Sequence, residues 1–493
     1  MQFIPTRSLT AEPVGQFFTP DYVARSLVKW VVSSPGDRLL DPSCGDGGVL
    51  RYHSLAKGIE ADPYAAVVAR QRAPAAQIEN DDFFLWASRT KERFECAAGN
   101  PPFVRFQKFK GDSRSAATSI CEAHGVKLSN LGSAWAAFLV VTATLLKPGG
   151  RMAFVVPAEI GHAPYAKPVL QYLTENFSSV HVVAIRDKIF PHLSEDCWLL
   201  YCDGFGGGTD GVDFSNVDRF SFHEHPPQIS EHAKWQQLSN EWKGRLRPLL
   251  LPAAARELYL RVGYRSTSKR LGDFAKINIG YISGDNDFFH LRASEARERN
   301  IAASYLIPTV RKGSSITKDV IDDEEVRRWV RDDEPSFLLS LPPDTDLPDQ
   351  VTAYLDSPRG LRARARFKCR TRRQWYSVPG IVRPCYFLQY MSGADVRLAR
   401  NIVGAACTNS VLAVRLLNNA EANTCLPLWM SPLTRLSCEL EGHPLGGGML
   451  KLEPGEARKV VFDKAGLEKD DLAVALSALE TIRSWRHVRS GSS

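Results

Sequence analysis

Short apolar runs alternate with helical stretches along the first 235 or so residues of this 493-residue chain. Such alternation is typical of parallel strands that are joined by crossover helices. No repeat of about 20 to 50 residues is present, which excludes solenoids and propellers. The expected strands are 38–41, a strand that ends near Glu60, 96–98, 151–156, 179–185 and 197–202. The first part of the chain is therefore predicted to form an α/β domain.

Two helices of this domain have clear local signals. The opening helix can be capped by Thr19, and Pro20 suits its first helical position. The apolar residues at helical spacing are Val23, Leu27, Val28 and Val31. A second, long helix is expected over 133–146, where the turn-forming run 147–150 stops it.

The pattern changes in the second half of the chain. The glycine-rich stretch 204–208 and the polar segment through Pro227 are predicted to lead out of the α/β domain. From about residue 245 mixed strands, loops and basic clusters follow without a βαβ rhythm, and a helical pattern returns near the end. We therefore expect a first domain over 1–240, an α+β domain over 241–460 and a helical tail over 461–493.

Composition and charge indicate the general class of protein, but they say little about its function. The chain is 44% hydrophobic and 24% charged, an ordinary globular balance. Its ten cysteines include no Cys-x-x-Cys pair, which indicates a reducing cytosol. Neither a leader sequence nor eighteen consecutive apolar residues is found, so we expect a cytoplasmic protein without a membrane span. The net charge of +7 suits a polyanionic partner without proving one.

A glycine turn follows the first expected strand. Residues 39–48 read as a strand, a tight turn and the start of a helix, which lets the backbone approach a bound nucleotide. About twenty residues later Glu60 ends the next strand, where a carboxylate can accept hydrogen bonds from both hydroxyls of a ribose. Further on, Asp82 and Phe83 offer a carboxylate and a ring for an adenine base, or simply a loop acid beside a core phenylalanine. A site for NAD is less favoured, because no Gly-x-Gly-x-x-Gly series is present.

The segment Asn100-Pro101-Pro102-Phe103 is the most specific feature of the sequence. Two prolines fix φ and remove two donors, so the side-chain oxygen of Asn100 and the carbonyl of Pro101 can form a rigid pair of acceptors. Such a pair can hold the hydrogens of an amino group on an aromatic ring, direct its lone pair and stabilise the charge that develops on transfer. A base in a duplex would have to be rotated out first, and stacking on Phe103 could recover part of that cost.

These motifs resemble, in order and spacing, those of the gamma class of N(6)-adenine DNA methyltransferases, the TaqI-like enzymes of type II restriction-modification systems. The resemblance is strong over 15–205 and looser beyond, and it adds the element Phe17-Phe18-Thr19-Pro20 in front of the glycine turn. It implies a Rossmann-like methyltransferase fold with a mixed seven-stranded sheet flanked by helices, followed by a C-terminal α+β target-recognition domain.

The resemblance also implies roles for individual residues. The S-adenosylmethionine site would be lined by Thr19, Pro20, Asp41, Ser43, Glu60, Ala61, Asp82, Phe83 and Asn100. The flipped adenine would be held by Asn100, Pro101, Pro102 and Phe103, with Phe190 as a second aromatic. Phe103 stands where the family more usually has tyrosine, which preserves stacking and removes a hydroxyl.

A basic cluster in the second domain is consistent with DNA as the partner. Eight of the fifteen residues over 359–373 are Lys or Arg, a density that would neutralise phosphates and make binding sensitive to salt. Such a run more often forms a charged helix that faces solvent. Glycine-rich 280–289 is similar to a segment in the recognition domains of the same enzymes. We expect double-stranded DNA as substrate, a monomeric enzyme and, as an open alternative, a separately encoded endonuclease.

Other functions were weighed against this interpretation. Protein-glutamine and ribosomal RNA methyltransferases use similar Asn-Pro-Pro segments, but they usually lack the Phe-x-Thr-Pro element and a C-terminal domain of this size. An inactive DNA-binding subunit would not need the motifs at 41–42 and 100–103 to be intact. A fused restriction enzyme is not indicated, because no convincing nuclease motif is found. Cys197 and Cys202, and the histidines at 223, 225 and 232, do not form a closed ligand set, so no metal is predicted. The DNA recognition sequence is not encoded in a readable form.

Overall fold

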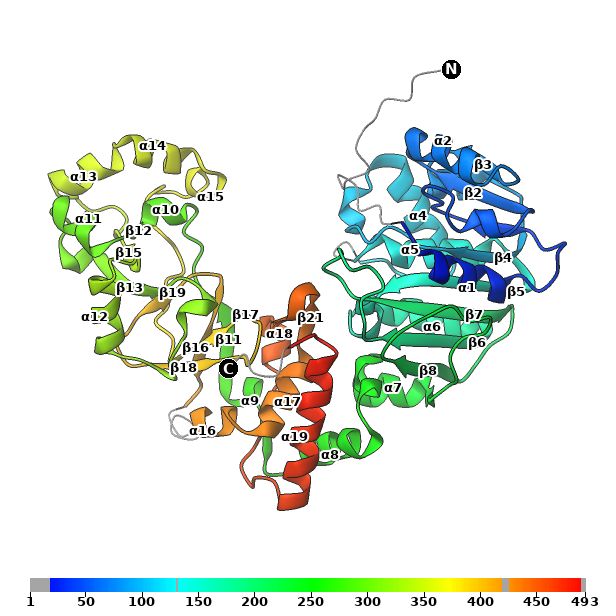
Figure 1. The fold of residues 1–493 in the computed structure, drawn as a ribbon. Helices are drawn as coiled ribbons and strands as arrows, with labels where there is room; N and C mark the ends of the chain where they lie inside the picture. Colours follow the sequence, from blue (N-terminus) through cyan, green and yellow to red (C-terminus); the bar gives the residue numbers. More distant parts are fainter. Residues whose placement is uncertain (1–17, 130–131, 419–424, 489–493) are drawn as a thin grey trace. The chain divides into compact units, whose positions relative to one another are not determined.

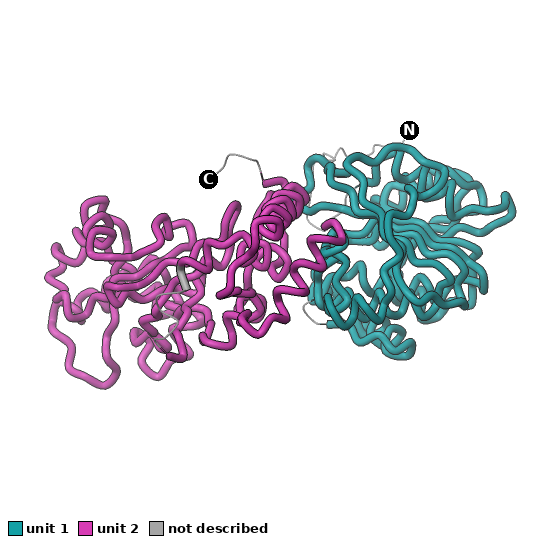
Figure 2. The backbone as a smooth tube through the Cα atoms, turned by 90° about the horizontal axis from the view of Figure 1, so that it is seen from below, with its two compact units in different colours: residues 1–250 teal, residues 251–493 magenta. Residues whose placement is uncertain are grey.

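The computed structural model describes residues 18–129, 132–418 and 425–488. It divides the chain into two compact units, 1–250 and 251–493 (Figure 2). No helix of the described residues is long and apolar enough to cross a membrane.

The first unit contains a mixed nine-stranded sheet with the strand order β3-β2-β1-β4-β5-β7-β6-β8-β9 (Figure 1). Strands β1 to β5 pair in parallel, β7 runs antiparallel to both β5 and β6, and β9 runs antiparallel to β8. The strands are β1 (Leu39–Asp41), β2 (Ala56–Glu60), β3 (Gln77–Asn80), β4 (Phe94–Gly99), β5 (Leu146–Pro157), β6 (Phe177–Ile185), β7 (Cys197–Phe205), β8 (Gly211–Val217) and β9 (Glu231–Lys234). The predicted α/β class is therefore confirmed.

Helices flank this sheet, as Figure 1 shows. They are α1 (Asp21–Val31), α2 (Pro63–Arg72), α3 (Phe83–Arg89), α4 (Gly111–Ala123), α5 (Ala134–Thr144), α6 (Ala166–Asn176) and α7 (Trp235–Trp242). The buried face of α1 includes Val23, Leu27, Val28 and Val31, as predicted, because these positions recur at the helical period. In contrast α5 is apolar around most of its circumference, and every side chain from Ala134 to Ala143 is buried.

Several details of the first unit differ from prediction. The run 147–150, predicted as the turn that stops the long helix, belongs to β5, and β3 was not among the predicted strands. The sheet has nine strands over the described residues instead of seven, because β8 and β9 continue it beyond β6. The stretch 204–208 accordingly contains the end of β7 and the turn toward β8, and it does not lead out of the unit. Gly204 and Gly206 adopt φ of +73° and +90°, which glycine allows at little cost, and β8 then buries Val212 and Phe214. Finally, α1 begins one residue later than expected, with Pro20 at its N-cap and no side-chain cap from Thr19.

The second unit combines several small sheets with short helices. Its sheets have the orders β11-β20-β16-β18-β14, β12-β15-β13-β19, β17-β22-β21 and β10-β23. These strands are β10 (Ser268–Arg270), β11 (Ala275–Ile279), β12 (His290–Leu291), β13 (Leu306–Val310), β14 (Val320–Ile321), β15 (Phe337–Leu339), β16 (Tyr386–Gln389), β17 (Met391–Ser392), β18 (Leu398–Asn401), β19 (Ala406–Cys407), β20 (Val411–Leu416), β21 (His443–Leu445), β22 (Met449–Lys451) and β23 (Val461–Asp463). The architecture is α+β.

The helices of the second unit are mostly short. They are α8 (Ala253–Gly263), α9 (Leu271–Phe274), α10 (Asn286–Phe289), α11 (Ala293–Glu298), α12 (Asp323–Arg331), α13 (Asp349–Leu355), α14 (Pro358–Ala365), α15 (Phe367–Arg370), α16 (Cys425–Trp429), α17 (Pro432–Glu441), α18 (Pro454–Ala457) and α19 (Lys469–Ser484). The last helix, α19, packs against α17 and α8 and is therefore part of this unit.

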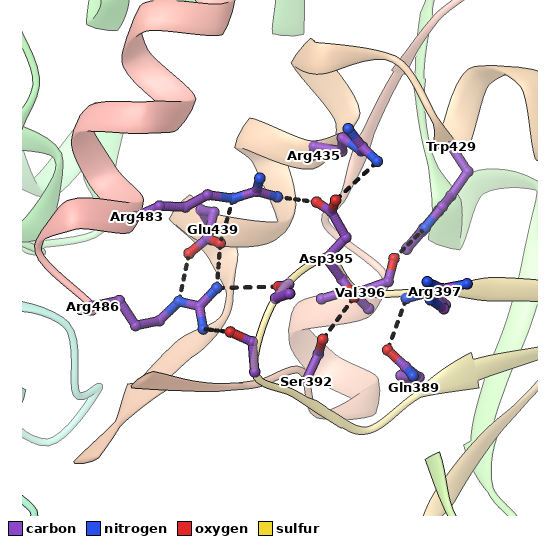
Figure 3. Close-up of polar contacts among 12 residues, drawn as sticks. Gln389, Ser392, Asp395, Val396, Arg397, Trp429, Arg435, Glu439, Arg483 and Arg486 are labelled. Atoms are coloured by element: carbon purple, nitrogen blue, oxygen red, sulfur yellow. Dashed lines mark hydrogen bonds and ion pairs between the residues drawn. The ribbon is translucent and has the colours of Figure 1, made fainter. Parts of the chain in front are cut away.

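A buried ion-pair network joins the end of α19 to α17 and to the loop at 392–397 (Figure 3). The side chain of Arg486 is 1% exposed, and its Nε and Nη2 donate to the two carboxylate oxygens of Glu439 at 3.1 and 2.7 Å. Its remaining N–H groups donate to the carbonyls of Gly393, Ala394 and Gly448. One guanidinium thus fixes three separate segments of the second unit.

Candidate functional site

Four parallel strands of the first unit end at one edge of the sheet, and the predicted site residues follow these ends. Asp41 at the end of β1 lies opposite Gly58 in β2, and Glu60 at the end of β2 lies opposite Asn80 in β3. On the other side β1 pairs in parallel with β4, which Asn100 follows directly. Ligands of open α/β sheets bind at the carboxyl ends of such strands. The edge is therefore the candidate site.

The glycine turn after β1 lies directly against the Asn100 segment after β4. The hydroxyl of Ser43 donates to the backbone oxygen of Asn100 at 3.4 Å, and the Ser43 N–H donates to Asp41 Oδ1 at 3.1 Å. A Cβ atom on Gly99 would lie 2.6 Å from Asp41 Oδ1, so only glycine permits this close approach of β4 to the carboxylate. Two motifs that are 57 residues apart are thus brought together.

The carboxylate of Glu60 holds the glycine turn in place. Its Oε2 accepts from the N–H of Gly45 at 2.8 Å, and its Oε1 accepts from the N–H of Asp62 at 2.8 Å. Gly45 adopts φ of +53°, and a Cβ atom on it would meet no atom within 4 Å, so the space beside the turn is open. A carboxyl group at the end of this strand is placed where the hydroxyls of a bound ribose can meet it.

Burial and neighbouring charge raise the pKa values of the acids at this edge. Burial raises the pKa of Asp41 from an ordinary 3.8 to about 8; the backbone hydrogen bond from Ser43 opposes this, and the charges of Glu60 and Asp46 add to it. Burial likewise raises the pKa of Glu60. Burial also raises the pKa of Asp46, against the opposing effect of its ion pair with Arg72. Perturbed pKa values of several acids at one sheet edge are typical of a functional site.

The raised pKa of Asp41 predicts a pH dependence of stability. The folded chain binds this proton more tightly than the unfolded chain, so the stabilisation is complete below pH 3.8 and is lost as the pH rises through about 8. Relative to the variant Asp41→Asn, the wild type should lose up to about 1.4 kcal/mol per pH unit between about pH 5 and about pH 8. Denaturant unfolding of both proteins at several pH values measures the difference. Parallel pH curves would show that Asp41 ionises normally, and Asp112→Asn at an exposed position controls for loss of a charge.

Asp82 and Phe83 follow β3 at the same edge, but both also serve the fold. Asp82 is the N-cap of α3, where its Oδ1 accepts from the N–H groups of Phe84 and Leu85, and its Oδ2 accepts from the Ser113 hydroxyl at 2.8 Å. Phe83 is 4% exposed, and its ring stacks on Phe138 at a centroid distance of 5.1 Å. Their place fits a cofactor site, and their contacts equally fit a capping acid beside a core ring, so the cofactor role stays a prediction.

The proline segment after β4 is anchored at both ends. Pro101 is buried, whereas Asn100, Pro102 and Phe103 are half-buried. At the far end, the Val104 carbonyl accepts from the N–H of Ala134 at 2.8 Å, which ties the segment to the start of α5. The ring of Phe103 packs against the core cluster that includes Phe190, itself 7% exposed. The structure thus places both predicted aromatics around one cluster.

The remaining predicted residues lie at the margins of this edge. Thr19 and Pro20 are half-buried, and they lead into α1, whose buried face belongs to the same cluster as Phe103 and Phe190. Ala61 is exposed beside Glu60, and its carbonyl accepts from the side-chain amide of Asn80 at 3.2 Å. Gly15, Gln16 and Phe17 of the predicted Phe-x-Thr-Pro region lie outside the described residues.

Several further residues, not predicted from the sequence, shape this edge. The side chain of Asn80 also donates to the Glu60 carbonyl at 2.7 Å and so fixes the end of β2. Gly58 permits close packing of β2 on the turn, because a Cβ atom there would lie 2.7 Å from Cys44 Sγ. Ser113 reaches Asp82 from α4. Of these residues, only Asn80 could have been suspected from the sequence, because it immediately precedes two aspartates.

The residues considered as metal ligands make other contacts. His232 contacts Asp213 Oδ1 at 2.7 Å and Asp210 Oδ1 at 2.9 Å, and Cys197 and Cys202 are separate buried thiols on β7. Among the residues that the structure describes, no group of three or more His, Cys, Asp or Glu side chains could hold a metal ion.

Two family models match most of the chain. The Eco57I restriction-modification methylase model matches residues 54–190, which include the glutamate and proline motifs, and the C-terminal domain model of the type II methyltransferase M.Eco57I matches residues 243–486. The chain belongs to the type II restriction-modification methylases. Two relatives are similar to this chain over nearly its whole length.

These two relatives are named type II methyltransferases. M.AccI of Acinetobacter calcoaceticus is 21% identical over 479 residues, which cover 92% of this chain and 86% of the relative. M.XamI of Xanthomonas campestris pv. amaranthicola is 24% identical over 486 residues, with coverage of 91% and 85%. Modification methylase CviBIII of Paramecium bursaria Chlorella virus NC1A is 30% identical, but over 168 residues that cover 31% of this chain and 41% of the relative.

Solved structures show a more distant similarity. The type IIG restriction endonuclease BpuSI is 14% identical with a TM-score of 0.45, and the match covers 97% of this chain and 67% of that one. The type IIL restriction-modification enzyme MmeI, in complex with DNA, is 13% identical with a TM-score of 0.48, and the match covers 96% and 71%.

Proposed function

We propose that this methylase transfers a methyl group from S-adenosylmethionine to the exocyclic amino nitrogen of adenine in duplex DNA. The observation that carries the proposal is the contact between the Ser43 hydroxyl and the Asn100 backbone, together with the close approach of Gly99 to Asp41. It joins the glycine turn, where a nucleotide can bind, to a segment that can hold an amino group. The type II methylase family supports the same reaction class.

The residues at the sheet edge fit S-adenosylmethionine. The Glu60 carboxyl group lies at the end of β2, where it can meet the hydroxyls of a ribose, the space beside Gly45 is open, and the perturbed pKa values of Asp41 and Glu60 are typical of a functional site. When bound, S-adenosylmethionine would supply a methyl group activated by its sulfonium. Asp41, Ser43 and Glu60 would hold it, with further contributions from Thr19, Pro20, Ala61, Asp82, Phe83 and Asn100.

The Asn100 segment would prepare the acceptor. The amino nitrogen of adenine is a poor nucleophile because its lone pair is delocalised into the ring. The side-chain oxygen of Asn100 and the carbonyl of Pro101 would accept its two hydrogens, which favours a pyramidal nitrogen and stabilises the positive charge that develops. As the bond between this nitrogen and the methyl carbon forms, the carbon–sulfur bond of the donor would break and the sulfur would keep its electron pair, and one of the two hydrogens would then leave the nitrogen as a proton. Pro102 stiffens the segment, and Phe103 and Phe190 would pack against the flipped base.

The second unit would recognise the DNA sequence. Its basic segment over 359–373 suits phosphates, and the α+β unit is distinct from the unit that holds the glycine turn. We propose a monomeric cytoplasmic enzyme that protects DNA against a separately encoded endonuclease.

Modification mapping tests this proposal directly. Unmethylated plasmid is incubated with the full chain and S-adenosylmethionine, and modified bases are located by sequencing that detects them. We expect methylated adenines within one short recurring sequence. Methylated cytosine, or methyl transfer to RNA or protein without transfer to DNA, would contradict the proposal. Incubation of the same plasmid with magnesium reveals any nuclease activity of the chain.

A further inference from the structure

The basic segment over 359–373 contains two kinds of cation. Four of its arginines contact the protein: Arg359 pairs with Glu295, Arg366 with Asp285 and Arg373 with Asp344, and Arg372 donates to the backbone oxygens of Ile282 and Ser283. The other four cations are exposed and have no acidic partner among the described residues: Arg362, Arg364, Lys368 and Arg370. The second set can bind an external anion without breaking an ion pair.

An exposed aromatic ring lies among these free cations. Phe367 is 63% exposed, although Ala363 and Cys369 on either side of it are fully buried. The ring centroid is 5.9 Å from Lys368 Nζ and 5.5 Å from Arg370 Cζ. Single exposed aromatic rings are common on protein surfaces, so what distinguishes Phe367 is its position among these cations.

Residues next to Phe367 anchor its segment to the glycine-rich loop at 280–289. Cys369 points inward toward the Ser283 carbonyl at 3.9 Å, and the backbone of Gly284 packs beneath α15. A Cβ atom on Gly284 would lie 2.7 Å from Cys369 Sγ, and its φ of +90° also favours glycine. The two hydrogen bonds of Arg372, 2.8 and 2.7 Å long, tie the same glycine-rich loop to the end of the segment. Helices α14 and α15 lie at one end of the second unit (Figure 1), and these contacts anchor the segment that carries Phe367.

A ligand for this surface must be polyanionic and must also offer flat apolar faces. Duplex DNA meets both requirements, since its phosphates suit the four free cations and its bases can stack on or receive an aromatic ring. We propose that Phe367 lies directly against bases of the bound duplex while Arg362, Arg364, Lys368 and Arg370 contact phosphates. This inference rests on the proposed function, because that function supplies DNA as the partner.

The salt dependence of DNA binding separates a ring contact from a charge contact. The full chain is titrated against a labelled duplex that carries the mapped methylation sequence, at several salt concentrations. Each of Arg362→Ala and Arg370→Ala should lower the slope of log affinity against log salt by about 1. Phe367→Ala should weaken binding about 10-fold at every salt concentration without changing that slope, because stacking releases no counterions. Phe367→Trp should bind like the wild type.

Matched variants and the alternative outcomes complete the test. Tyr264 is 73% exposed on the same unit outside the basic segment, and Tyr264→Ala should leave affinity unchanged. Wild-type affinity of Phe367→Ala would overturn the inference, and so would a fall in slope like that of the arginine variants. If Arg362→Ala also binds normally, the surface belongs to another partner, such as a protein. Failure of the wild type to methylate DNA would instead overturn the proposed function.

Discussion

Asn100→Ala is expected to reduce methyl transfer at least about 100-fold while S-adenosylmethionine binding persists. Removing one preorganised acceptor of a developing charge typically costs this much in rate. The substitution leaves the Ser43–Asn100 contact possible, because that contact uses the backbone oxygen of residue 100. Rates of transfer to the mapped DNA sequence, and the dissociation constant of the cofactor from calorimetry, provide the two measurements.

Two further variants make this prediction specific. Asn100→Asp retains an acceptor oxygen and should keep more activity than Asn100→Ala. Ser43→Ala removes the hydroxyl donor to the backbone, so it should perturb the position of the segment and cost less than the loss of the acceptor itself. Transfer by Asn100→Ala near the wild-type rate would contradict the role of the side chain, even if adenine proves to be the methylated base.

Parallel strand topology explains why part of the candidate site was predictable. The residues after successive parallel strands meet at one edge, so Asp41, Glu60 and Asn100 could be expected to lie together from their order alone. The steric contacts that set the distances between these residues could not be predicted from the sequence. The approach of Gly99 to Asp41 depends on the register between β1 and β4, which no local pattern encodes.

The last strands of the sheet and the roles of the residues in the charged cluster were harder to predict. Strand β8 has only two buried apolar residues, Val212 and Phe214. Because so short a pattern does not distinguish a strand from a polar loop, the sequence did not predict that the sheet continues there. In the basic segment, residue type gave the same signal for all eight cations. Tertiary partners such as Glu295 and Asp285 determine which arginines stabilise the fold and which face solvent.

Arg486→Ala is expected to destabilise the second unit by about 3 to 5 kcal/mol, since it removes one member of a buried ion pair. The variant leaves Glu439 with Arg483 as an ion-pair partner, at 3.4 Å, and takes a donor from each of three backbone carbonyls. The change should lower the denaturant midpoint and speed amide hydrogen exchange in 390–398, 432–450 and 469–484. Exchange in β1 and β4 of the first unit provides the internal reference.

Arg483→Ala is the matched control, because Arg483 lies one helical turn earlier and is 21% exposed. It contacts Asp395, which keeps a second partner in Arg435 at 2.9 Å, and Glu439, which keeps its two hydrogen bonds from Arg486. A partly solvated ion pair contributes little, so this variant should cost about 1 kcal/mol. Equal effects of the two variants would show that burial of the Arg486 guanidinium is not what holds the last helix in place. A midpoint for Arg486→Ala within error of the wild type would show that the three segments are fixed by apolar packing alone.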